Sequence, residues 1–197
     1  DIAQRVVSEL KVALSPEERR ALTEAPTQDA HAYALYVQGM QAYGDSNQAL
    51  QEADREALRK RAADLLRAAV ERDPEFALAW AALTQMLASI AWDTRYSDYR
   101  DYAAQARTAA ANATAFGADL PEARYARGVV LLQLDLDFAK ALPELEYAAE
   151  RLPNVAAIQA ALGLAYRYNG RWDDYLRASR RALALEPTAL GYAGAVR

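Results

Sequence analysis

The sequence of 197 residues contains no cysteine and a single histidine. The missing thiols exclude disulfide bridges, thiolate zinc sites and cysteine-based catalysis. His31 has no second histidine or thiol with which to share a metal ion, so we expect no metal site. No apolar run is long enough to cross a bilayer, and no membrane span is predicted in this fragment.

Catalytic signatures are missing as well. There is no glycine-rich phosphate loop and no Gly-x-Ser-x-Gly elbow, and His31 has no evident partner for general-base work. We therefore expect a non-catalytic chain that uses no cofactor. The formal net charge of −4 indicates that this fragment does not contact nucleic acid.

The chain is rich in helix-forming residues. Apolar residues make up 53% of it, with alanine and leucine prominent among them, and β-branched residues are sparse. That composition is sufficient for a sizeable core. An all-α fold is predicted.

One stretch near the C-terminus, Gly163 to Pro187, sets the pattern for the rest. Asn169-Gly170 is a turn signal between two helices, and Pro187 stops the second. Less regular copies precede this unit. The sequence thus predicts helical hairpins at about 30–74, 75–117, 121–153 and 155–187, then a truncated helix up to Arg197.

The hairpin resembles the tetratricopeptide repeat, which has a period of about 34 residues. Seven signature positions carry the resemblance: Leu162, Gly163, Tyr166, Gly170, Trp172, Ala182 and Pro187. It implies an α-α superhelix (solenoid) of about four repeats, with extra N-terminal helices. Residues 1–28 would be N-terminal helices and a linker from the end of an upstream domain, and residues 29–197 the array.

Four local features are expected along the array. Gly44-Asp45-Ser46-Asn47 signals a turn after the first helix. An insertion at about 48–59 is itself helix-prone and should lengthen the second helix, and another lies at about 93–100. Pro143 should delay or kink the helix in which it lies.

The resemblance also implies a binding site, because such arrays use the concave groove lined by the first helix of each repeat. The side chains at the inward positions are largely apolar or aromatic, which suits an extended peptide or an amphipathic helix. They are Tyr33, Tyr36, Met40, Tyr43, Leu78, Gln85, Ser89, Tyr125, Val129, Leu132, Leu164, Arg167 and Tyr168. The alternative is that another helix, such as residues 1–22, fills the groove.

One class of partner is argued against. Chaperone-binding tetratricopeptide domains hold a terminal carboxylate with Lys, Asn and Arg. The corresponding positions here carry Tyr36, Met40, Ala82, Glu122 and Ala126, so this clamp is missing.

A second aromatic group follows Trp92, at Tyr96, Tyr99 and Tyr102. Helical spacing places these tyrosines on one stripe, which fits either a contact patch or packing beneath a loop. Packing is the more common outcome for such a stripe.

The N-terminal fifth of the chain carries a wider resemblance. Residues 1–39 are similar to the junction between a TolB-like domain and a tetratricopeptide array in large bacterial signalling proteins. Those proteins include class III adenylate cyclases, winged-helix transcription regulators and kinases. The resemblance implies a sensory or scaffold region that binds a protein or peptide, or a second copy of itself.

Two alternatives remain at this point. One is a non-catalytic fragment of a nucleotide cyclase, and the other is a small-ligand sensor that uses the tyrosine-lined groove. For the location, the cytoplasm is favoured, or the periplasm if the parent protein is membrane-anchored.

Overall fold

The structure, a computed structural model, describes residues 26–93 and 99–187. These residues form α-helices and no strand, as the composition predicts. The helices are α3 (Ala30–Gln48), α4 (Glu52–Arg72), α5 (Ala77–Asp93), α6 (Tyr99–Phe116), α7 (Pro121–Gln133), α8 (Phe138–Arg151), α9 (Ala156–Tyr168) and α10 (Trp172–Leu185). None of these helices is long and apolar enough to cross a membrane.

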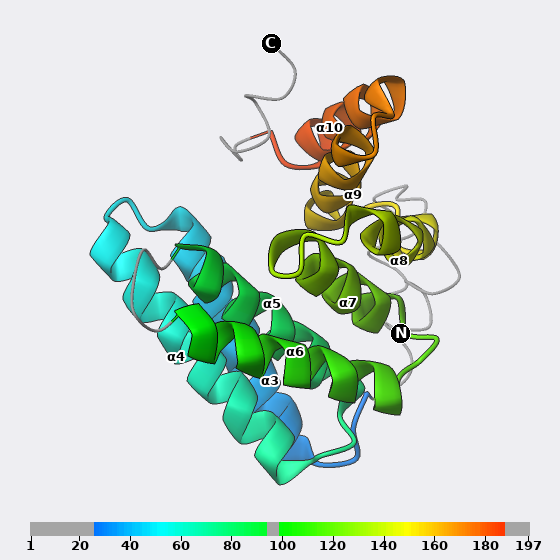
Figure 1. Cartoon of the computed structure of the whole chain (residues 1–197). Helices are drawn as coiled ribbons and strands as arrows, with labels where there is room; N and C mark the ends of the chain where they lie inside the picture. Colours follow the sequence, from blue (N-terminus) through cyan, green and yellow to red (C-terminus); the bar gives the residue numbers. More distant parts are fainter. Residues whose placement is uncertain (1–25, 94–98, 188–197) are drawn as a thin grey trace, which may run out of the picture.

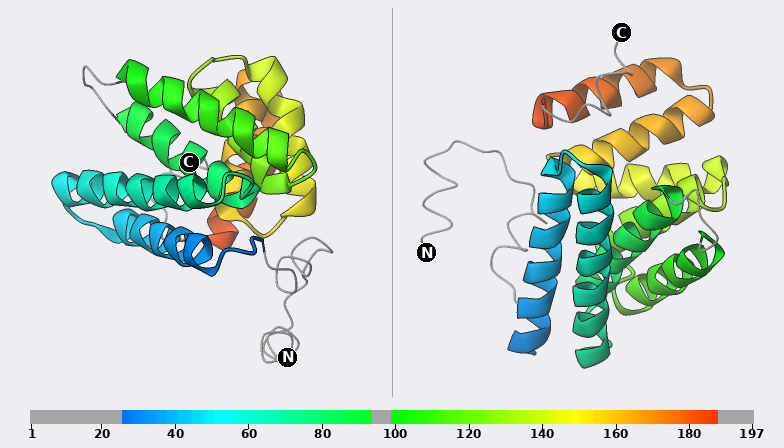
Figure 2. Two further views of the ribbon diagram at one scale, coloured as in Figure 1. Left: turned by 90° about the horizontal axis from the view of Figure 1, so that it is seen from below. Right: turned by 90° about the vertical axis from the view of Figure 1, so that its left-hand side faces the viewer.

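Consecutive helices pair into four hairpins, α3 with α4, α5 with α6, α7 with α8, and α9 with α10. Each hairpin packs on the next one, through α4 on α5, α6 on α7, and α8 on α9. Figure 1 shows this stack, and the second view of Figure 2 places the first and last hairpins at opposite ends of it. The architecture is therefore an α-α solenoid. The predicted N-terminal helices at 1–25, much of the insertion at 93–100 and the truncated helix after Pro187 lie outside the described residues.

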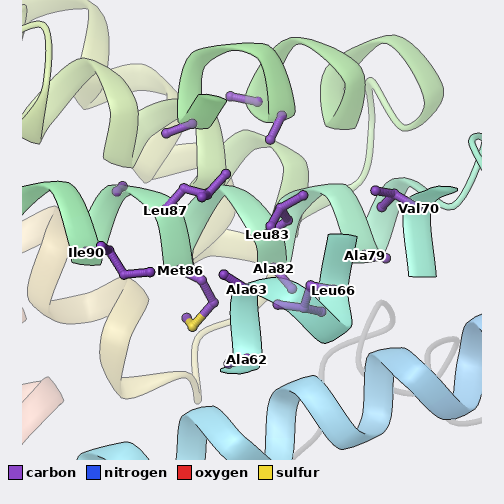
Figure 3. Packing of buried hydrophobic residues seen from close by; sticks show 14 of the residues in the cluster. Ala62, Ala63, Leu66, Val70, Ala79, Ala82, Leu83, Met86, Leu87 and Ile90 are labelled. Atoms are coloured by element: carbon purple, nitrogen blue, oxygen red, sulfur yellow. The ribbon is translucent and has the colours of Figure 1, made fainter. Parts of the chain in front are cut away.

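Alanine dominates the contacts between helices. Ala62 and Ala69 of α4, together with Ala79 and Ala88 of α5, are fully buried. Small side chains let two helix axes approach closely, and larger side chains fill the space beside them. In Figure 3, α4 contributes Leu66 and Val70 to this layer, while α5 contributes Leu83, Met86, Leu87 and Ile90.

The first hairpin corrects one prediction. The turn expected at Gly44–Asn47 is wrong, because α3 continues to Gln48 and the turn follows it. Buried Ser46 fits inside the helix since its hydroxyl donates a hydrogen bond to the carbonyl of Tyr43, at 2.7 Å. The insertion at 48–59 thus lengthens both helices, and the expected long second helix is confirmed in α4.

The helix that contains Pro143 does not start late. α8 begins at Phe138, ahead of the proline, because the Asp137 side chain caps it by accepting a hydrogen bond from the Lys140 backbone N–H. Pro143 cannot donate to the carbonyl of Ala139, and both residues are exposed. The delayed start is therefore wrong.

Two arginines on α7 stand where the repeat usually has apolar residues. Arg124 Nη1 lies 3.1 Å from Glu144 Oε2 and Arg127 Nη1 lies 3.4 Å from Glu144 Oε1, so both pair with the same nearly buried carboxylate of α8. A buried charge needs such partners. Here an ionic contact joins α7 to α8 in place of an apolar one.

Candidate functional site

Glycines fix the register of the first helices. A Cβ added at Gly39 would lie 2.8 Å from Leu66 Cγ, and one added at Gly128 would lie 2.6 Å from Leu145 Cδ2. A Cβ added at Gly163 would likewise lie 3.1 Å from Ser179 Oγ. In each case the missing side chain allows the second helix of the same hairpin to approach closely. These three contacts define equivalent positions in α3, α7 and α9, and buried Thr84 takes the glycine position in α5.

Four residues of the predicted groove surface are exposed, and they come from the first and last hairpins. Tyr33 on α3 is 45% exposed, whereas Leu164 and Tyr168 on α9 are 37% and 52% exposed. Arg167 is exposed beside them. Large apolar side chains in water favour contact with a partner.

Seven of the predicted residues are only partly accessible. The apolar ones are partly buried and pack against core side chains. The set comprises Tyr36, Met40, Tyr43, Leu78, Gln85, Ser89 and Tyr125. These seven residues come from α3, α5 and α7.

Two of the predicted residues are core residues. Val129 and Leu132 of α7 are buried in the clusters that join α7 to its neighbours. A ligand cannot reach these side chains while the hairpins stay packed, so we remove them from the candidate surface. Sequence spacing alone does not reveal this, because the burial comes from contacts between hairpins.

Tyr36 lies in a partly buried aromatic group. Its ring centroid is 5.3 Å from that of Phe76 and 6.2 Å from that of Tyr33. Burial raises the pKa of Tyr36 to about 12, and the nearby Glu122 carboxylate and Tyr33 add to this effect. The phenol is therefore neutral at physiological pH and acts as a hydrogen-bonding aromatic group rather than an acid.

Glu122, in the first turn of α7, is an unusual neighbour for these rings. Its Oε2 atom is buried and has no hydrogen-bond partner among the residues that the structure describes. Burial raises the pKa of the Glu122 carboxyl, and a hydrogen bond from its own backbone N–H opposes this only in part. An unpaired buried carboxylate is costly, so burial makes ionisation of Glu122 less favourable than it is in water.

At the other end of the surface, aromatic stacking joins two hairpins. The rings of Phe138 on α8 and Tyr168 on α9 lie parallel, with centroids 4.2 Å apart. Tyr166 donates a hydrogen bond to Glu146 Oε1 at 3.1 Å, and Arg171 Nη1 approaches the same oxygen at 3.0 Å. Burial, followed by the bond to Glu146, raises the pKa of Tyr166 to about 12.

One cleft has no counterpart among the residues that the sequence predicts for a site. It has a volume of about 630 Å³ and lies at the tip of the first hairpin, where the insertion lengthens both helices. Asp45 and Asp54 line it together with Leu58 and Arg61. The helix-prone insertion was the available signal, but the cleft itself depends on the position of the turn after α3, which was predicted too early.

The aromatic stripe after Trp92 separates into two environments. Tyr102 packs against the core, whereas Trp92 and Tyr99 are exposed. Tyr96 lies outside the described residues.

Among the residues that the structure describes, no group of three or more His, Asp or Glu side chains is placed to hold a metal ion.

Solved structures of the same shape exist. A thermophilic TPR protein of Thermus thermophilus, TTC0263, matches with a TM-score of 0.62 and 24% identity, over 90% of this chain and 86% of that chain. The "MamA RS-1 ArsTM double mutant" matches with a TM-score of 0.51 and 19% identity, over 86% and 83% of the two chains. The chain has the tetratricopeptide fold. The expected solenoid is thereby confirmed.

No protein-family model matches this sequence, and no curated protein matches it. Identities below a quarter establish the tetratricopeptide fold alone, because one fold supports many functions. Function must therefore be argued from the surface residues of this chain.

Proposed function

We propose that this tetratricopeptide chain is a protein-interaction module without catalytic activity of its own. It binds an extended peptide or an amphipathic helix along the first helices of its hairpins. The observation that supports this most is the exposure of Tyr33, Leu164 and Tyr168, which lie on this surface at the two ends of the array. We call the surface formed by the predicted first-helix residues, without Val129 and Leu132, the first-helix surface.

The chemistry of the surface suits an apolar partner. Aromatic side chains bury much area and lose little conformational entropy when a partner covers them. The tyrosine hydroxyls supply hydrogen bonds to a peptide backbone at the same time. A partner that offers leucine, isoleucine or aromatic side chains along one face fits this surface.

A displayed random-peptide library tests the proposal. Peptides selected on the wild-type chain are titrated against the double variant Tyr33→Ser/Tyr168→Ser. We expect affinity to fall about tenfold or more, as it does when central aromatic contacts are removed. The matched control is Phe116→Ser, which removes an exposed aromatic ring from the second helix of a hairpin. That control should bind as the wild type does.

Two results would contradict the proposal. One is that no peptide is selected above background. The other is that the control loses as much affinity as the double variant, which would place the binding surface elsewhere. Circular dichroism of each variant shows that the helices remain formed.

The cellular context is a further proposal. The resemblance of residues 1–39 supports a regulatory or scaffold region of a bacterial signalling protein, behind a TolB-like domain. The reading frame upstream of Asp1 tests this directly. A TolB-like domain there would agree with it, and an unrelated domain would overturn it. A cyclase domain in the same frame would make this chain the non-catalytic part of a nucleotide cyclase.

The small-ligand alternative uses the same tyrosines. A thermal-shift screen of small metabolites distinguishes it from peptide binding. Stabilisation that disappears in the Tyr33→Ser/Tyr168→Ser variant, without any selected peptide, would favour the small-ligand sensor.

A further inference from the structure

The hairpins of this chain bury the same three positions of each first helix beneath the preceding hairpin. These positions lie five and two residues before the glycine position and two residues after it. Their side chains are between 0% and 6% exposed. They are Ala79, Ala82 and Met86 in α5; Ala123, Ala126 and Val130 in α7; and Ile158, Ala161 and Ala165 in α9.

The first hairpin leaves these positions uncovered. In α3, which no described hairpin precedes, they carry Ala34, Val37 and Gln41. All three are exposed, Val37 to 44%. We call these three residues the head face. Ala34 and Val37 are small and apolar enough for helix packing, yet this face has no neighbouring hairpin among the described residues.

On the last hairpin, the opposite side is not covered by any other described residues. Phe138 begins α8 and is covered by Tyr168 of the following hairpin. Trp172 begins α10 at the matching place and is 60% exposed. Buried Leu132 on α7 likewise corresponds to exposed Arg167 on α9. We call Trp172 and half-buried Ala160 the tail face, which lies beside Arg167 of the first-helix surface.

Among the described residues, none takes the place over Trp172 that Tyr168 takes over Phe138. A first helix stacked on the last hairpin would supply such a residue. The first hairpin offers a fitting surface for this contact beside the head face. Its residue at the position of Tyr168 is Gly44, and a Cβ added there would meet nothing within 4 Å. The indole of Trp172 therefore has room beside α3 of a second copy.

The two ends also carry opposite charge. The first hairpin, residues 29–73, has eight acidic and six basic side chains. The last hairpin, residues 156–187, has five arginines and three acidic side chains. Two tail ends would repel each other, whereas a tail and a head attract. Complementary charge steers such encounters.

We propose that the tail face of one copy of this chain binds the head face of a second copy, so that copies assemble head to tail. Each junction repeats the packing already present between hairpins inside one chain. Such an interface joins different faces, so it continues into rings or open filaments rather than stopping at a dimer. The proposal does not depend on peptide binding by the first-helix surface.

Sedimentation equilibrium of the whole chain tests the assembly. Val37→Arg blocks the head by adding a bulky cation opposite the arginine-rich tail, and Trp172→Arg blocks the tail. The average mass of the wild type should rise with protein concentration. For each variant alone, the dissociation constant of self-association should rise about tenfold or more, because a buried contact is replaced by a charge. An equal mixture of the two variants should form dimers and nothing larger, through the one intact head and the one intact tail.

Ala104→Arg is the matched control, since Ala104 is exposed on α6 and belongs to neither face. It should assemble as the wild type does. A wild type that stays monomeric at every concentration would overturn the proposal and assign both faces to other partners. Single variants that self-associate as tightly as the wild type, or a mixture that forms no dimer, would also overturn it. Peptide titration of Val37→Arg keeps the two proposals apart, because it should bind peptide normally.

Discussion

Gly128 of α7 lies directly beneath Leu145 of α8, so closely that a Cβ at residue 128 would stand 2.6 Å from Leu145 Cδ2 and 2.7 Å from Cγ. Real Cβ atoms do not approach carbon this closely without displacement of a neighbour. Leu145 is fully buried, and in a close-packed interior the displacement of its side chain disturbs other contacts. The glycine is therefore what permits the two helices to pack at this distance.

Gly128→Ala should lower the free energy of unfolding by about 1–3 kcal/mol, through overpacking of this contact. Urea denaturation measures the change. The control is Gly44→Ala, because Gly44 is helical and nothing lies near its missing Cβ. Alanine should stabilise that position by about 0.5–1 kcal/mol. Equal effects at the two glycines would contradict the packing argument.

How far the sequence predicts this molecule depends on how local each feature is. The helices and hairpins follow from glycine, alanine and proline spacing within single repeats, and α9 with α10 obeys that spacing closely. The sequence misplaces the turn after α3 because glycine commonly ends a helix, whereas Gly44 lies inside α3. The burial of Val129 and Leu132 depends on neighbouring hairpins, which no local pattern records. Site prediction is limited in the same way.

Gly163 offers a graded comparison with Gly128. A Cβ there would lie 3.1 Å from Ser179 Oγ and 3.6 Å from Ala178 Cβ, which is tight but not prohibitive. Gly163→Ala should therefore cost less unfolding free energy than Gly128→Ala. Gly163→Leu should overpack the α9–α10 contact and cost about 1–3 kcal/mol. Thermal denaturation of the three variants ranks them, and an alanine cost at Gly163 above that at Gly128 would disagree with the structure.

Asp29 caps α3 and links it to the end of α4. Its Oδ1 accepts hydrogen bonds from the backbone N–H groups of His31 and Ala32, at 2.8 and 3.0 Å, and from Arg72 Nε at 2.8 Å. The hydrogen bond from Arg72 and the cap together lower the pKa of Asp29 to about 2. The folded state therefore favours the ionised carboxylate.

The sign of the pH dependence follows from this shift. The stabilisation by Asp29 is complete above the pKa of the unfolded chain, near 4, and is lost as the pH falls toward about 2. Asp29→Asn keeps a cap but not the charge. The stability advantage of the wild type over this variant should shrink between about pH 5 and pH 2.5, as measured by urea denaturation. A constant difference across that range would exclude the proposed role of the charge.

Glu122 should give the opposite dependence. Its buried Oε2 has no hydrogen-bond partner among the described residues, and burial raises the pKa of the carboxyl in the folded state. Above the ordinary pKa of glutamate, about 4.3, the unfolded chain releases this proton while the folded chain retains it, so the folded state loses relative stability as the pH rises. Glu122→Gln removes the ionisation and keeps an oxygen for the backbone N–H. Urea denaturation should show that this variant gains stability over the wild type at about pH 7 but not at about pH 4. An equal gain at both values would mean that shape, rather than charge, distinguishes the two side chains.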